Sequence, residues 1–169
     1  MGRTGKLFAY EHYNILPDVM TLAKALGNGF PIGAAVIADK FTKYLPKGAH
    51  GSTFGGNHLA SRVAFETLKI IMSREILENV EALSQFIFQR LKSIQQTSKV
   101  IEEVRGIGLH IGVQLDRPCS QVVESCMKKG LLVNCTSGNT IRIMPPLNIS
   151  LENVAKGLDI FEESLLELN

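Results

Sequence analysis

The feature that most constrains the fold of this chain is an apolar stripe at helical spacing in its middle. The stripe recurs at steps of three and four residues over about five turns, and its members are Ile76, Leu77, Val80, Leu83, Phe86, Ile87, Leu91 and Ile94. Glu78, Gln85 and Lys92 fall outside it, so one side of the segment is apolar and the other is polar. The pattern predicts a long amphipathic helix.

Shorter patterns of two kinds surround this helix. Helical spacing or a cap marks residues 57–73, 120–129 and 151–168, with Asn57 and Ser150 at N-cap positions. Apolar runs bounded by turn residues predict strands, the first two of them buried, at residues 19–23, 32–38, 104–115, 131–135 and 140–144. A polar segment near residues 95–98 separates two parts. We predict an α/β chain with one part at residues 1–96 and a small α+β domain at residues 97–169.

The composition excludes several classes of function. Of the 169 residues, 45% are hydrophobic and 20% are charged, which is typical of a folded chain with a core. The net charge is +2 and the basic residues are scattered, so we expect no nucleic-acid partner. No apolar stretch approaches the roughly 20 residues of a membrane span, and residues 1–6 are not a signal peptide. We therefore expect no membrane partner and a cytoplasmic location.

Neither the cysteines nor the histidines show the spacing of a familiar site. Cys119, Cys126 and Cys135 are odd in number and lack a CxxC pair, so we expect buried free thiols and no disulfide or zinc site. The histidines at positions 12, 50, 58 and 110 lack the spacing of metal ligands. No metal is expected.

Lys24 is the first candidate for chemistry. It follows an apolar run and precedes the small residues of Ala25-Leu26-Gly27-Asn28-Gly29. An amine partly withdrawn from water at the end of a buried strand is suited to Schiff-base chemistry, and the small residues leave room for a planar cofactor. A strand-end lysine that simply reaches solvent is the alternative, and the residue pattern alone favours it.

Two other candidates are suited to binding anions. Residues 50–57 are Gly-rich, carry the hydroxyls of Ser52 and Thr53, and lead into a helix, which suits a phosphate site. The lysine of a P-loop is missing, and without further information an ordinary loop and helix cap is the alternative. Arg142 lies between Ile141 and Ile143 in a strand pattern, so its guanidinium emerges on the opposite face. A bound carboxylate or phosphate and an internal acidic residue are both open as its partner. Arg3 could contact phosphate, although a solvated turn is the simpler explanation.

Taken in order, these segments resemble the class III pyridoxal-phosphate-dependent aminotransferases. The similarity spans the whole chain and lies in residues 2–12, 17–18 and 21–27, in the HGSTFGGN loop at residues 50–57, and in residues 104–109 and 139–147. It implies the C-terminal portion of the fold type I aminotransferase architecture, with part of the large domain and a small α+β domain.

The resemblance also implies a role for each candidate residue. Lys24 would hold pyridoxal 5′-phosphate (PLP) as a Schiff base and move a proton between the substrate carbon and the cofactor. Thr53 would reach the cofactor phosphate of the partner subunit in a homodimer, Ser52 would lie beside the substrate, and Arg142 would bind the substrate carboxylate. The implied reaction moves the amino group of N-acetylornithine, or of a close ω-amino substrate, to 2-oxoglutarate in arginine biosynthesis.

The family's chains begin well upstream of this one, so the resemblance implies a fragment. The aspartate that pairs with the pyridine nitrogen, an aromatic residue that stacks on the ring and a phosphate-binding loop have no counterpart here. A truncated chain that folds without catalysis is therefore one alternative. An ornithine, succinylornithine or 4-aminobutyrate aminotransferase is another, and a phosphate or nucleotide binder that uses Ser52 and Thr53 without Lys24 is the third.

Overall fold

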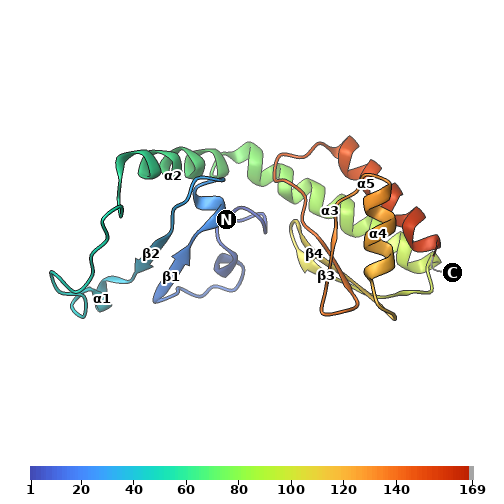
Figure 1. Ribbon diagram of the computed structural model, residues 1–169, viewed down its shortest axis with the longest axis horizontal. Coiled ribbons are helices and arrows are strands. Elements are labelled where there is room, and N and C mark those ends of the chain that lie inside the picture. Colours follow the sequence, from blue (N-terminus) through green and yellow to red (C-terminus); the bar gives the residue numbers. More distant parts are fainter. Residues whose placement is uncertain (168–169) are drawn as a thin grey trace.

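The computed structural model describes residues 1–167, and two consecutive helices follow one another along the long axis of the molecule (Figure 1). Helix α2 spans His58–Ile71 and helix α3 spans Arg74–Thr97. The first part of the chain lies along α2, whereas the elements that follow α3 pack around α3 itself. The two helices thus link two groups of elements that share few other contacts.

The first part of the chain contains a two-stranded antiparallel ribbon. Strand β1 (Val19–Leu22) pairs with β2 (Ala34–Ile37). The prediction that these strands are buried is wrong, because Val19 is 53% exposed and Val36 is 51% exposed. No third strand joins the ribbon within residues 1–167, so the outer edge of each strand has no strand partner. Three short helical turns complete this part: η1 (Ala9–His12), η2 (Lys24–Leu26) and α1 (Asp39–Thr42).

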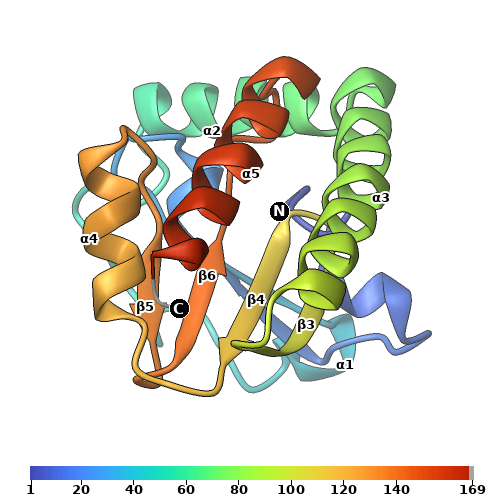
Figure 2. The same ribbon diagram turned by 90° about the vertical axis from the view of Figure 1, so that its right-hand side faces the viewer.

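The second part is an antiparallel sheet with helices on one face, as Figure 2 shows. The strand order is β3-β4-β6-β5, and all neighbours are antiparallel. The elements are β3 (Ile101–Ile107), β4 (His110–Leu115), α4 (Ser120–Lys128), β5 (Asn134–Thr136), β6 (Thr140–Ile143) and α5 (Leu151–Leu166). Helices α3, α4 and α5 cover one face of this sheet. The other face is open, and the side chains of Arg105 and Arg142 are exposed.

The apolar stripe of α3 forms the centre of the core, which confirms the helix predicted from its spacing. Val80, Leu83, Ile87, Leu91 and Ile94 are all buried. They pack in one cluster with strand and helix side chains of the second part, among them Ile111, Val113, Ile141, Leu158 and Phe161. The helix that precedes residue 97 therefore shares its core with the residues that follow. The division at residue 96 stays a prediction.

The segment at residues 104–115 differs from its predicted single strand, because it contains two strands and a tight turn. Gly108 has φ +60° at this turn, and a Cβ there would lie 2.4 Å from the carbonyl oxygen of Arg3. A residue with a side chain would be strained in this conformation and would collide with the neighbouring backbone. The left-handed glycine thus reverses the chain and produces the β3–β4 hairpin.

The helix caps predicted from sequence are present in two of three places. The side chain of Asn57 accepts a hydrogen bond from the Ala60 amide at 2.9 Å, and that of Ser150 accepts one from the Asn153 amide at 3.3 Å. Helix α4 follows Cys119, which provides no side-chain cap. Leu168, the predicted last member of the α5 stripe, lies outside the described residues.

The cysteines do not all remain free thiols, so that prediction is wrong. Cys119 precedes α4 and Cys135 lies in β5, and the packing of α4 beside β5 brings their Cα atoms to 5.7 Å, where they form a disulfide. This separation is ordinary for a disulfide, but a spacing of 16 residues gives no sequence signal for it. Cys126 is a buried free thiol, and burial raises the pKa of this thiol.

Alkylation counts test this arrangement directly. We expect iodoacetamide to modify no cysteine in the folded chain, because Cys126 is buried and its raised pKa leaves little thiolate. Intact-mass measurement should show one adduct after denaturation and three after denaturation with a reductant, since Cys119 and Cys135 react only when their bond is reduced. Three adducts without a reductant would show that the disulfide is not formed.

Within residues 1–167, no helix combines the length and the apolar character that crossing a membrane requires.

Candidate functional site

Lys24 lies at a strained point of the backbone. Strand β1 ends at Leu22, and Lys24 opens the short helical turn η2 with φ +51°. Residues other than glycine seldom adopt a positive φ, and such strained residues cluster at functional sites. The carbonyl of Lys24 accepts hydrogen bonds from the amides of Gly27 at 3.1 Å and Asn28 at 3.2 Å. The following turn therefore holds Lys24 in this conformation.

The side chain of Lys24 is exposed, so the predicted partial withdrawal from water is not present in the structure. It lines an open pocket of about 430 Å³ with residues of the following turn, including Phe30 and Ile32. It also lines a larger cavity of about 580 Å³ at the junction between the two parts of the molecule. The lysine predicted as the reactive residue is thus placed where a small molecule has room.

The larger cavity joins residues that are far apart in the sequence. It is lined by Arg3 and Lys24 from the first part, by Thr67, Ile70, Ile71 and Ile76 of α2 and α3, and by Met144, Pro146, Leu147 and Asn148 after β6. Among the described residues that line it, basic side chains are present and acidic ones are absent. Such a lining suits an anionic ligand.

Arg3 is half-buried, and the prediction of a solvated turn at this residue is wrong. Its guanidinium donates a hydrogen bond to the carbonyl of Pro145, and its own carbonyl accepts one from the Leu109 amide at 2.8 Å. Burial lowers the pKa of Arg3. Its sequence signal is weak, since the glycines at positions 2 and 5 indicate a tight turn but say nothing of its partners.

Arg142 lies on the open face of the second sheet. Ile141, its neighbour in β6, is fully buried, whereas Arg142 is exposed. The pairing of four strands places Arg142 in one row with Arg105, Gly112 and Asn134. Its Nε donates to the Oδ1 of Asn134 at 3.0 Å, so the partner is an amide and not an acidic side chain. The predicted strand geometry is confirmed, and the guanidinium still has donors for a carboxylate.

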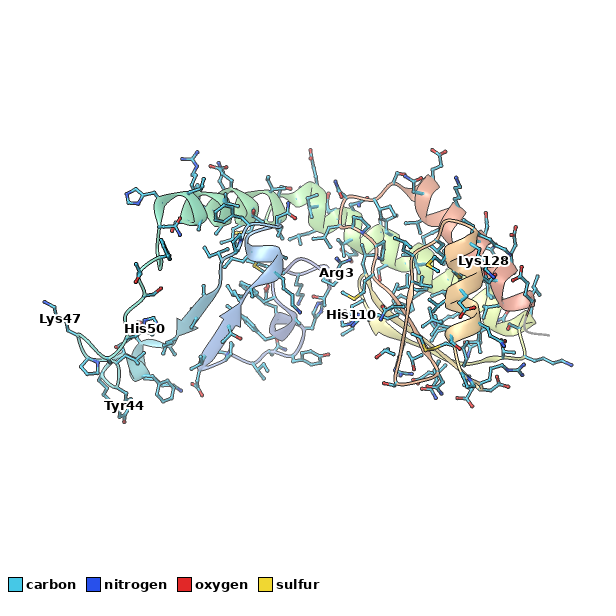
Figure 3. The ribbon with its side chains drawn as sticks, viewed as in Figure 1. Arg3, Tyr44, Lys47, His50, His110 and Lys128 are labelled. Atoms are coloured by element: carbon cyan, nitrogen blue, oxygen red, sulfur yellow. A yellow bond between two sulfur atoms is a disulfide. The ribbon has the colours of Figure 1, made fainter. Side chains whose placement is uncertain are left out.

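Ser52 and Thr53 are not brought together with Lys24. Both are exposed on the segment between α1 and α2, which extends away from the body of the molecule, as the positions of Tyr44, Lys47 and His50 in Figure 3 show. Helix α2 has 14 residues and therefore separates this segment from Ile71, at the other end of the helix, by about 20 Å. Among residues 1–167, Ser52, Thr53 and Arg142 line neither cavity that contains Lys24.

Metal ligands are not assembled in the described part of the chain. Across residues 1–167, no three His, Cys, Asp or Glu side chains are grouped so that they could hold a metal ion. The chemistry available is therefore that of an exposed amine, two arginines and the hydroxyls of the extended segment.

A family model and the curated relatives both identify the chain as similar to aminotransferases. The family model for aminotransferase class-III matches residues 1–165. The chain is 42% identical over 166 residues to the acetylornithine aminotransferase of Clostridium acetobutylicum, and this match covers 98% of the chain and 43% of that protein. The chain thus spans less than half the length of the curated relatives it matches.

Two solved structures have the same arrangement of elements. The acetylornithine aminotransferase of Elizabethkingia anophelis superposes with a TM-score of 0.90 at 32% identity, and it is matched over 98% of this chain and 45% of its own. The ornithine delta-aminotransferase of Plasmodium falciparum superposes with a TM-score of 0.90 at 35% identity, over 98% of this chain and 44% of its own. The architecture is that of the C-terminal portion of these enzymes, and the chain belongs to the class III aminotransferase family.

Proposed function

We propose that this chain provides the lysine and one carboxylate-binding arginine of a PLP-dependent aminotransferase that acts on N-acetylornithine, or a close ω-amino substrate, with 2-oxoglutarate. The observation that carries the proposal is Lys24, which is exposed, has a strained backbone and lines a positively charged cavity at the junction of the molecule. The identity to proteins named acetylornithine aminotransferase supports the choice of amino donor.

The residues around Lys24 fit PLP. Within residues 1–167, no hydrogen bond or ion pair holds the Lys24 side chain, so its amine can react with a carbonyl group once the ammonium has lost a proton. A Cβ at Gly29 would meet nothing within 4 Å, which leaves space beside the lysine for a planar ring. When bound there, PLP supplies an electron sink for bond cleavage at the substrate carbon.

The chain's own residues orient the substrate and move the proton. Lys24, once its amine is free, is the group placed to take a proton from the substrate carbon and return it. Arg142 has terminal N–H groups available for a two-pronged grip on a substrate carboxylate. Among the described residues of the cavity that Lys24 lines, none is acidic, so no carboxylate there competes with an anionic ligand for Lys24.

We also propose a homodimer in which Thr53 reaches the cofactor phosphate of the partner subunit and Ser52 lies beside the substrate there. Their distance from the cavity of their own chain, about one length of α2, supports delivery to a second subunit. The exposed apolar side chains of the same segment, Tyr44, Leu45 and Phe54, support its burial in an interface. A cytoplasmic enzyme of arginine biosynthesis is the setting consistent with this reaction.

A panel of amino donors tests the reaction. The complete polypeptide in which this sequence occurs is loaded with PLP and assayed with 2-oxoglutarate and N-acetylornithine, ornithine, succinylornithine or 4-aminobutyrate. We expect kcat/KM for N-acetylornithine to exceed that for ornithine by roughly tenfold or more, since even one methylene in an apolar pocket is worth about 1–3 kcal/mol and the acetyl group is larger. The 169-residue chain, assayed in parallel, tests whether this portion alone is a non-catalytic fragment.

A preference for ornithine would show that the proposed amino donor is wrong, whereas the proposed reaction, transamination, would still hold. Ornithine is the first donor to compare because the chain matches the ornithine delta-aminotransferase of P. falciparum. Failure of every donor in the complete, PLP-loaded protein would contradict the proposed function.

A further inference from the structure

The segment that follows β6, residues 144–149, lies between the strand of Arg142 and helix α5. Met144, Pro146, Leu147 and Asn148 from this segment line the same cavity as Lys24. Any displacement of the segment therefore changes the wall of the cavity and moves the C-terminal end of β6, the strand that carries Arg142.

Two residues of this segment lack a backbone hydrogen-bond donor. Pro145 and Pro146 have no N–H, so the segment is held largely through its carbonyl oxygens. Pro146 accepts a hydrogen bond from the Ile149 amide at 3.2 Å, and Leu147 accepts one from the side chain of Asn79 in α3 at 2.7 Å. The carbonyl of Pro145, three residues after Arg142, accepts from the guanidinium of Arg3.

Arg3 is itself fixed in the first part of the chain. It belongs to a turn closed by hydrogen bonds from the Gly5 amide to the Gly2 carbonyl at 3.0 Å and from the Gly2 amide to the Leu7 carbonyl at 2.9 Å. Gly2 is buried so tightly that a Cβ there would lie 2.8 Å from Ile71 and 2.9 Å from Leu147. The turn is thus wedged between the end of α2 and the segment after β6.

Arg3 contacts the second part of the molecule at two separate places. Its carbonyl accepts the Leu109 amide of the β3–β4 turn, and its guanidinium holds Pro145. Figure 3 shows Arg3 at the junction of the two parts, next to the edge where His110 begins β4. A hydrogen bond from a half-buried cation is stronger than one between neutral groups, so this contact is well suited to hold two bodies in register.

We propose that Arg3 is a positioning residue, which fixes the strand of Arg142 relative to Lys24 through the Pro145 carbonyl and so sets the affinity for the substrate carboxylate. The effect on substrate affinity rests on the proposed function, whereas the hydrogen bond between Arg3 and Pro145 does not depend on that function. The guanidinium acts through β6 and is not assigned contact with substrate or cofactor.

The kinetic test uses the complete, PLP-loaded protein with Arg3→Gln, Arg3→Lys and Arg74→Gln. We expect Arg3→Gln to raise KM for 2-oxoglutarate roughly tenfold, the scale of one charged hydrogen bond, with kcat changed less than about threefold. Arg3→Lys keeps a cationic donor and should recover part of the loss. Arg74 is an exposed arginine paired with Glu78 in α3, and its replacement should leave both constants unchanged.

A double-mutant cycle separates positioning from general destabilisation. In an Arg142→Ala background, Arg3→Gln should raise KM less than about twofold, because the residue it positions is already absent. An equal increase of KM in both backgrounds, or a fall in kcat with KM unchanged, would overturn the proposal.

Hydrogen exchange gives a readout that does not require turnover. Arg3→Gln should speed amide exchange in residues 147–149, with the α3 amides unchanged, whereas unchanged exchange at residues 147–149 would overturn the positioning role. If no donor is transaminated by the parent protein, the proposed function fails and exchange alone still decides whether Arg3 holds this segment. Should Arg3→Gln fold poorly, Arg3→Met repeats the measurement, because methionine keeps an unbranched side chain without a hydrogen-bond donor.

Discussion

Lys24→Ala should reduce transamination by the complete, PLP-loaded protein by at least about 10⁴-fold, because the residue proposed to act as both nucleophile and proton carrier is lost. The alanine removes an exposed side chain that has no hydrogen-bond or ion-pair partner within residues 1–167, so the fold should persist. Borohydride reduction followed by peptide mass spectrometry should find the PLP adduct on Lys24 in the parent protein and no adduct at that position in the variant.

Two companion variants make this result specific. Lys92→Ala removes an exposed lysine of α3 and should leave activity and the adduct unchanged. Lys24→Gly should be as inactive as Lys24→Ala but more stable by about 1 kcal/mol in denaturant unfolding, because glycine adopts the positive φ of this position without strain.

Adducts spread over several surface lysines would contradict the assignment of Lys24. Phosphate binding that survives in Lys24→Ala, with no transamination in the parent protein, would instead favour the alternative of a phosphate binder at Ser52 and Thr53.

Gly106→Ala should lower the free energy of unfolding of the 169-residue chain by about 3 kcal/mol, measured by urea titration followed by circular dichroism. Gly106 lies in β3 opposite Ile111, with φ +141°. A Cβ there would lie 2.1 Å from the His110 carbonyl oxygen and 3.0 Å from the Ile111 Cα. Since both atoms belong to backbone, they cannot move aside as the end of a flexible side chain would.

Gly130→Ala is the matched control for this substitution. Gly130 also has a positive φ, +87°, but a Cβ there would meet nothing within 4 Å. Gly130→Ala should therefore lower the free energy of unfolding only by the cost of placing alanine at a positive φ, about 1 kcal/mol. Equal losses at the two positions would show that the backbone around Gly106 is not as closely packed as the structure has it. The packing of Gly106 bears on the candidate site, because it holds the β3–β4 hairpin together and β4 pairs with the strand of Arg142.

Local patterns predicted much of the secondary structure for a simple physical reason. The stripe from Ile76 to Ile94, the Asn57 and Ser150 caps and the strand alternation at Arg142 all depend on interactions within a few residues. The division of residues 104–115 into a hairpin was not predicted, because an apolar segment with glycines is compatible with one strand or two. The segment forms a hairpin because Gly108 packs closely against the backbone of Arg3, which is more than a hundred residues away in the sequence.

The sequence by itself determined helices α2 to α5, the fold class, the family and the identity of Lys24, Ser52, Thr53 and Arg142 as candidates, because ordered motifs carry this information without three-dimensional context. Only the tertiary structure decided that Cys119 meets Cys135, that Arg3 holds Pro145, and that Lys24 lines a cavity from which Ser52, Thr53 and Arg142 are absent among the described residues. These are contacts between distant segments, and their geometry is set by how the helices pack, which no local pattern contains.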